Sequence, residues 1–95
     1  MAAEKNFENR IKRYLQENGI WYVKYFANGF TRRGVPDLLC CVNGKFVAVE
    51  VKAQDGHPSD LQIYEQKAIM KSGGVAVILY PSGFEKFKKL IEEML

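Results

Sequence analysis

The sequence contains few of the residues that build disulfide frameworks or zinc sites. Among its 95 residues there are two cysteines and one histidine, and the cysteines, Cys40 and Cys41, are adjacent. Neighbouring side chains of a strand point to opposite faces, so these thiols are not expected to bridge each other, and no zinc-ligand spacing surrounds them. We expect both to be small buried hydrophobic residues in a reducing compartment.

The chain also lacks a long apolar run. No stretch approaches the roughly 20 apolar residues of a membrane-spanning helix, and the polar N-terminus, MAAEKNFENR, has no apolar segment that could serve as a signal peptide. These absences predict a cytoplasmic protein with no membrane partner. The net charge of +3 indicates only a mild preference for anionic partners.

Apolar residues, in contrast, are frequent enough to fill a core, at 47% of the chain. A chain of this length fits one domain, so we expect residues 1–95 to form a single domain. The order of predicted elements is α-β-β-β-α-β-α, which favours an α/β fold with a mixed central sheet covered by helices on both faces. Spacing and turn residues place helices at 4–17, 59–72 and from 82 onward, strands at 20–26 and 75–80, and a hairpin between them.

The starts of the second and third helices carry capping signals. Ser59 with Gln62, and Ser82 with Glu85, have the spacing of a capping box. In the strand at 20–26 we expect Trp21 and Tyr25 to lie in the core.

The hairpin brings two acidic residues together. Asn43-Gly44 between two apolar runs predicts a two-residue type I′ turn. Pairing outward from that turn places Asp37 directly opposite Glu50 on one face, with Cβ atoms about 4.5–5.5 Å apart. Lys52, two residues after Glu50, points to the same face.

Two carboxylates this close repel each other unless a cation lies between them. Mg²⁺ or Mn²⁺ suits one or two carboxylates with further oxygen ligands. Such an ion polarises a phosphate oxygen and lowers the pKa of a bound water, and Lys52 could orient that water or stabilise the developing charge. The pattern therefore favours phosphodiester hydrolysis. The alternative is that both acids reach solvent at an open strand end and that Lys52 makes an ordinary ion pair.

At these residues the sequence resembles the PD-(D/E)xK nuclease superfamily. Pro36-Asp37 corresponds to "PD", and Glu50-Val51-Lys52 corresponds to "ExK". With Gly34-Val35 before the proline and Gln62 on the following helix, the chain looks like a stand-alone, phage-type member of the virus-type replication-repair nuclease (VRR-NUC) family. The resemblance covers nearly the whole chain.

This resemblance implies a restriction-endonuclease-like core and a metal-dependent endodeoxyribonuclease. It implies that Asp37, Glu50 and the Val51 carbonyl bind Mg²⁺ or Mn²⁺ and that Lys52 is the catalytic lysine, with no small-molecule cofactor. Gln62 would support the site, and Glu8, on the first helix, would lie near the metal as a catalytic residue and possible ligand. Gln62 and Glu8 each have a structural alternative. Gln62 has the spacing of a capping box with Ser59, and Glu8 has the spacing of an exposed ion pair with Lys12 on the helix.

The same resemblance implies branched DNA, such as four-way (Holliday) junctions, as substrate, and a homodimer of phage or prophage origin acting in the host cytoplasm. Lys24, Arg32 and Arg33 flank a polar loop and are predicted to bind phosphates, while Phe30 could stack on a splayed base. The alternative is a solvated basic loop. His57, beside Pro58, is expected to be a solvated loop residue.

Two other functions compete with the nuclease. The chain could be a non-catalytic nucleic-acid-binding module that kept the nuclease fold. It could also be a small structural or interaction domain with chance acids on a hairpin, which would bind neither divalent metal nor DNA.

Overall fold

The computed structural model describes residues 2–95. These residues form three α-helices, four strands and a short 3₁₀ turn, in the order that the sequence predicts. The elements in chain order are α1 (Ala2–Glu17), β1 (Trp21–Lys24), β2 (Leu38–Val42), β3 (Lys45–Val51), α2 (Asp60–Lys71), β4 (Val75–Leu79), η1 (Pro81–Gly83) and α3 (Phe84–Met94).

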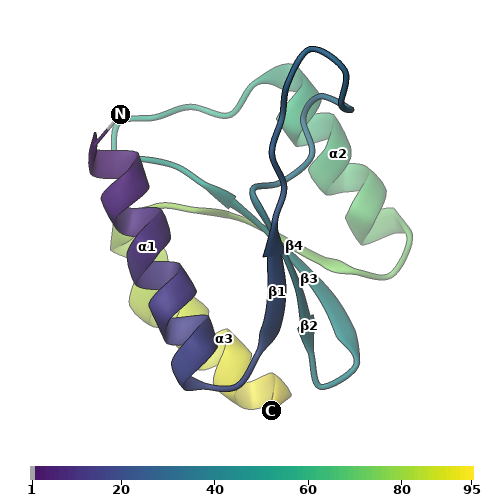
Figure 1. The fold of residues 1–95 in the computed structure, drawn as a ribbon. Helices are drawn as coiled ribbons and strands as arrows, with labels where there is room; N and C mark the ends of the chain where they lie inside the picture. The colour runs from purple at the N-terminus through teal and green to yellow at the C-terminus, as the bar shows by residue number, and fades with distance from the viewer. Residues whose placement is uncertain (1) are drawn as a thin grey trace.

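The strands form one mixed sheet in the order β1-β2-β3-β4. β1, β2 and β3 pair antiparallel, and β4 joins β3 in parallel after the crossover through α2. α1 and α3 lie on one face of the sheet and α2 on the other (Figure 1). The predicted α/β fold is therefore confirmed, and it is consistent with a restriction-endonuclease-like core.

The turn between β2 and β3 has the predicted conformation. Asn43 and Gly44 have φ angles of +49° and +83°, as a type I′ turn requires at both central positions. Val42 then pairs with Lys45, and the register continues without a bulge to Leu38 opposite Val49. Asp37 and Glu50 are the next residues along this register, and they are close enough for the charge of Asp37 to raise the pKa of Glu50.

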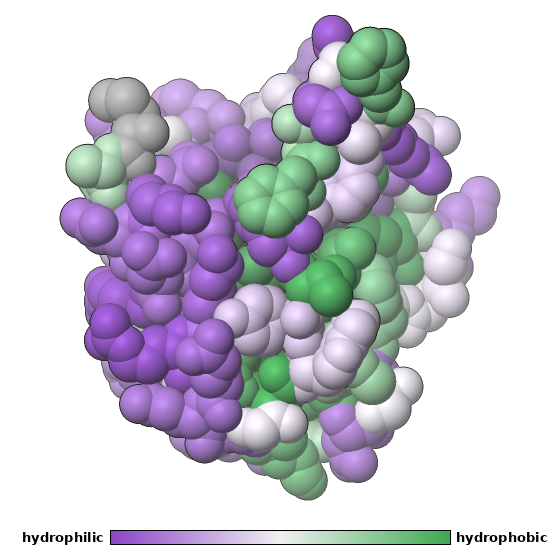
Figure 2. Space-filling model, viewed as in Figure 1, coloured by the Kyte–Doolittle hydropathy of each residue, from purple (hydrophilic) through white to green (hydrophobic). Residues whose placement is uncertain are grey.

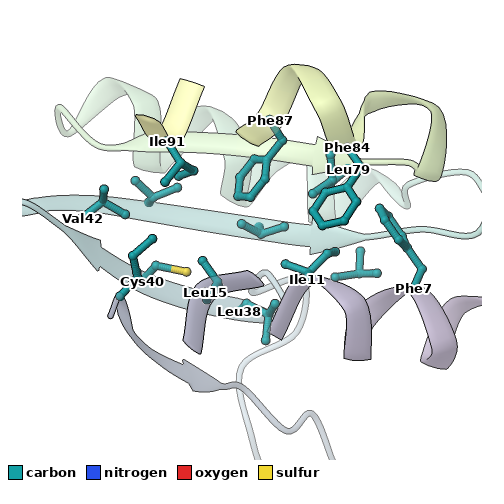
Figure 3. Packing of buried hydrophobic residues seen from close by; sticks show 14 residues of the cluster. Phe7, Ile11, Leu15, Leu38, Cys40, Val42, Leu79, Phe84, Phe87 and Ile91 are labelled. Atoms are coloured by element: carbon teal, nitrogen blue, oxygen red, sulfur yellow. The ribbon is translucent and has the colours of Figure 1, made fainter. Parts of the chain in front are cut away.

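The core lies between the sheet and the α1–α3 pair. Ile11 and Leu15 of α1 and Ile91 of α3 are completely buried, and Phe7 packs edge to face on Phe84 at a centroid distance of 5.5 Å. Figure 3 shows these helices enclosing the alternate side chains of β2 and β3. The side chains of one face of each helix pack in this layer against every second side chain of the strands.

The other face is covered only in part, because α2 lies over β3 and β4 and does not extend to β1. Trp21, on β1, is 65% exposed and Phe46 is 45% exposed, so the expectation that Trp21 lies in the core is wrong. Cys40 faces the core and is buried, whereas Cys41 faces this open side and is exposed, which corrects the expectation that both are buried. Figure 2 shows apolar surface over the strands between β1 and α2.

The two predicted capping boxes have different outcomes. Ser59 caps α2 as predicted, since its side chain accepts from the Gln62 N–H and the Gln62 side chain accepts from the Ser59 N–H. The box at Ser82 and Glu85 does not form. Pro81 starts a 3₁₀ turn that leads directly into α3, Gly83 becomes the N-cap, and the Ser82 N–H donates instead to Gln54.

Within residues 2–95, none of the helices has the length and apolar character needed to cross a membrane.

Candidate active site

Asp37 immediately precedes β2, at the end of the sheet where the β1–β2 loop returns. Its Oδ2 accepts a hydrogen bond from the Val51 N–H at 2.8 Å, so the carboxylate lies against the end of β3. The N–H and C=O of one strand residue point to the same edge of an antiparallel ladder, so we expect the Val51 carbonyl on the Asp37 side as well. This arrangement brings together three of the oxygen groups that the resemblance implies as metal ligands.

Glu50 is buried in the sheet at 3% exposure. Burial, and then the charge of Asp37, raise the pKa of Glu50 to about 8, although Lys52 acts in the opposite direction. The Lys52 Nζ lies 3.5 Å from Glu50 Oε2, and Glu50 Oε1 is buried with no hydrogen-bond partner. A buried carboxylate oxygen without a partner is costly, which is a reason to expect a ligand at this position.

Gln62 contacts the acid pair from α2. Its Nε2 donates to Glu50 Oε2 at 2.9 Å, while its Oε1 accepts from the Ser59 N–H at 2.8 Å. The capping alternative and the contact with the predicted site thus coexist in one side chain, because the two ends of the amide have different partners. This contact orients one oxygen of Glu50 and leaves the other available.

Glu8 lies on α1 among basic residues. It is 4% exposed, and it pairs with Lys24 at 2.7 Å, with Lys12 at 2.9 Å and with Lys5 at 3.7 Å. Burial raises the pKa of Glu8, but the hydrogen bonds and positive charges of Lys24 and Lys12 together outweigh this effect and hold the pKa below its usual value. Glu8 does pair with Lys12, as the structural alternative proposes, but Glu8 is buried and not exposed.

Lys24 joins Glu8 to Asp37. Its ammonium also lies 3.2 Å from Asp37 Oδ1. Burial lowers the pKa of Lys24, but the hydrogen bonds and charges of Glu8 and Asp37 together raise it above its usual value. The structure thus places the Lys24 side chain, 20% exposed, beside the acids and 5.9 Å from the Phe26 ring of the β1–β2 loop.

The donor set fits a hard divalent cation. Asp37, Glu50 and the Val51 carbonyl offer only oxygen ligands, and Glu50 Oε1 lacks any other partner. Across residues 2–95 there is no group of three or more His, Cys, Asp or Glu side chains placed to hold a metal. A site with two carboxylates suits Mg²⁺ or Mn²⁺, because Mg²⁺ keeps several of its water ligands in such sites.

The β1–β2 loop carries the other predicted DNA-binding residues and lies beside α2 (Figure 1). Phe30 is fully exposed at its tip, and Arg33 is exposed. The Arg32 side chain instead pairs with Glu65 of α2, with Nε 2.9 Å from Oε2. His57 is exposed in its loop, as expected.

Two further residues hold this loop in place, Glu65, which the sequence analysis does not single out, and Gly34, which it notes only as part of the GVPD motif. Glu65 is buried and anchors Arg32, and its position three residues after Gln62, on the same face of α2, is the only local signal for it. Gly34 has a φ of +82°, and a Cβ there would lie 2.6 Å from the Leu61 carbonyl oxygen. Close packing on α2 thus requires glycine at position 34, two residues before Pro36.

Two acids at the hairpin, a lysine two residues beyond one of them and a glutamine from the next helix are the residues by which the sequence resembles the PD-(D/E)xK nucleases. Residues 2–71 match the family model of the archaeal Holliday junction resolvase (Hjc), and the chain belongs to that family. Hjc is itself a member of the PD-(D/E)xK superfamily, so the resemblance is confirmed at that level. A search of curated proteins finds no match to the chain.

Proposed function

We propose that this protein is a Mg²⁺- or Mn²⁺-dependent endonuclease that hydrolyses phosphodiester bonds of branched DNA, with four-way junctions as its main substrate. The observation that carries the proposal is the buried Glu50 carboxylate, which has one unpartnered oxygen and lies opposite Asp37 and near Lys52. The membership of the Hjc family, which is named for Holliday junction resolution, supports the choice of substrate.

Each residue of the site has a distinct role in this proposal. Asp37, Glu50 and the Val51 carbonyl hold the cation, which supplies polarisation of the scissile phosphate and a water of lowered pKa. The hydrogen bond from Val51 N–H to Asp37 Oδ2 and that from Gln62 to Glu50 Oε2 keep the carboxylates oriented. Lys52 is the catalytic lysine, whose ammonium stabilises charge developing on the phosphate.

The β1–β2 loop is the proposed contact with DNA. Arg33 is exposed and free to bind a backbone phosphate, and Phe30 presents its whole ring for stacking on an unpaired base at the branch point. The long side chain of Arg32 is 68% exposed despite its contact with Glu65, so part of the guanidinium is available to a phosphate. Lys24 adds positive charge next to the acids.

A homodimer completes the proposal. The open sheet face carries the exposed side chains of Trp21, Val23 and Phe46 in adjacent rows, next to the row of Asp37 and Glu50. Large apolar side chains grouped on one surface are typical of interaction sites. Two chains joined there by a two-fold axis would present two sites to two strands of a junction.

The narrower identification as a VRR-NUC protein rests on the GVPD and EVK motifs and on Gln62, and it stays a prediction. Phage origin and action in the host cytoplasm depend on the same resemblance. The single nuclease domain over residues 1–95 is likewise proposed, on the ground that one shared hydrophobic cluster joins α1, the sheet and α3.

The test is cleavage of a labelled four-way junction, a flap, linear duplex and single strand in Mg²⁺, Mn²⁺ or EDTA. We expect metal-dependent, paired nicks in the junction, which disappear in Lys52→Ala. Folded protein that binds junctions but does not cut any substrate would contradict the nuclease and support the non-catalytic module. Cutting of flaps or single strands alone would retain the nuclease and change its substrate.

A further inference from the structure

The ammonium of Lys24 lies where two carboxylates from different elements converge. It is 2.7 Å from Glu8 Oε1 on α1 and 3.2 Å from Asp37 Oδ1 at the start of β2. Side chains from three separate elements meet there, 13 and 16 residues apart in the chain. The contact is therefore a product of the tertiary fold and not of local helix pairing.

The other oxygens of both acids are also engaged. Asp37 Oδ2 accepts the Val51 N–H, and Glu8 Oε2 faces the ammonium of Lys12 at 2.9 Å. Neither Glu8 Oε2 nor Glu50 Oε1 has a hydrogen-bond partner, but the ammonium groups of Lys12 and Lys5 lie 2.9 and 3.7 Å from Glu8 Oε2, whereas Lys52 pairs with the other oxygen of Glu50. A divalent ion between Glu8 and Asp37 would have to displace Lys24 and would then lie close to Lys12, and both effects oppose its binding.

The geometry points to Lys24 as a built-in cation that takes the place of a second divalent ion. The site then accepts one ion per chain, held by Asp37 and Glu50, and Glu8 acts as a positioning residue through Lys24 rather than as a metal ligand. This inference rests on the proposed metal site.

The arrangement also explains why Asp37 is held on both sides. Lys24 pulls Oδ1 toward α1, while the Val51 N–H binds Oδ2, so the carboxylate cannot rotate without losing a hydrogen bond. Lys24 thus performs two tasks, which are to neutralise Glu8 and to orient Asp37 toward Glu50.

The experiment is titration of the metal-free full chain with Mn²⁺ by calorimetry, with electron paramagnetic resonance to count bound ions. We expect one Mn²⁺ per chain in the wild type and an affinity that changes by less than about tenfold in Glu8→Gln, because the loss of a residue that only positions a ligand costs about 10- to 100-fold at most and Lys24 still holds Asp37 in this variant. In Lys24→Met, Glu8 and Asp37 are released, and we expect a second, weaker Mn²⁺ site. Lys12→Met is the matched control, because it removes a partner of Glu8 without touching Asp37, and it should keep one ion.

Two Mn²⁺ ions in the wild type, with one lost in Glu8→Gln, would overturn the inference while leaving the proposed nuclease intact. A single ion in a folded Lys24→Met variant would also overturn it. Absence of Mn²⁺ binding in the wild type would contradict the proposed function itself. Should Lys24→Met fail to fold, the wild-type stoichiometry and the Glu8→Gln affinity still decide the question.

Discussion

Glu8 and Glu50 are buried to nearly the same extent, at 4% and 3% exposure, yet their surroundings differ. Glu8 packs on the side of the sheet sealed by α1 and α3 and pairs with three lysines. Glu50 lies on the side that α2 covers only in part, with a single lysine 3.5 Å away and an acid opposite. As a result the pKa of Glu8 is lowered, while burial and Asp37 raise the pKa of Glu50 to about 8.

The comparison shows how one small fold separates stability from function. On the sealed face the charge of Glu8 is balanced by the lysines that pair with it. Each acid has one oxygen without a hydrogen-bond partner, but Lys5 and Lys12 face that oxygen of Glu8, whereas Lys52 pairs with Glu50 Oε2 and leaves Oε1 at the position where binding of a cation would remove the deficit. The half-covered face is the one on which a ligand, DNA and a second chain can all approach.

The largest expected effect comes from neutralising the acid of the open face. Glu50→Gln keeps the size of the side chain and removes a proposed metal ligand, so junction cleavage should fall by about 10³-fold or more, equivalent to about 4 kcal/mol of barrier. The measurement is single-turnover cleavage in Mg²⁺. Glu93→Gln, at an exposed position of α3, is the control and should cleave normally. Unchanged cleavage by Glu50→Gln would contradict the assignment of this face.

The sealed face should dominate stability. Leu15→Ala removes a completely buried side chain from the α1 layer and should lower the free energy of unfolding by about 2–5 kcal/mol. Leu61→Ala makes the same chemical change on α2, where the side chain is 49% exposed, and should cost less than about 1 kcal/mol. Urea denaturation of both variants checks the difference, and equal losses would show that α2 packs more tightly than described.

The loop beside α2 provides the next test. Gly34→Ala should destabilise the protein by about 1–3 kcal/mol, because its φ is positive and a Cβ would lie 2.6 Å from the Leu61 carbonyl oxygen. The loop carrying Asp37 should shift as well, and the affinity for Mn²⁺ should fall. Gly29→Ala, with nothing within 4 Å of the added Cβ, is the matched control. Thermal melting in EDTA and Mn²⁺ titration together separate the two effects, and a neutral Gly34→Ala would refute the packing argument.

The smallest effect is a pH dependence of the metal-free protein. Because the folded pKa of Glu50, about 8, lies above the ordinary value of 4.5, the folded state holds this proton more tightly than the unfolded state. The stability from this group is present below pH 4.5 and is lost as the pH rises through about 8. Relative to Glu50→Gln, the wild-type Tm in EDTA should therefore decline toward high pH, by about 5 °C.

Added Mn²⁺ should reverse this decline, since the ion replaces the proton on Glu50 and binds the folded state. Calorimetric scans at pH 5, 6.5 and 8.5, with EDTA or Mn²⁺, provide the test. Parallel Tm curves for wild type and Glu50→Gln in EDTA would show that Glu50 is not desolvated as the structure indicates.

Local signals account for most of what could be predicted about the fold. The Asn43-Gly44 turn decides the register of β2 on β3, and the register alone places Asp37 opposite Glu50. The box of Ser59 and Gln62 decides where α2 begins. Both depend on hydrogen bonds between residues close in sequence, which do not change with the packing of distant elements.

The two failures in burial have a common cause in how far α2 extends over the sheet, and the failed capping box has a local one. Trp21 and Cys41 have the composition of buried strand residues, but their face of the sheet is open at β1 and β2, so both are exposed. The capping box at Ser82 has the right spacing but not the right backbone, because Pro81 starts a 3₁₀ turn.

By itself, the sequence determined the order of elements, the hairpin register and the identity of the acids, because each follows from periodicity or from a turn of a few residues. The tertiary structure alone decided that Lys24 links Glu8 to Asp37 and that Arg32 pairs with Glu65, 33 residues away. It also left Glu50 Oε1 without a partner. Ion pairs between distant elements depend on how the helices pack across the sheet, and this packing is set by the whole core.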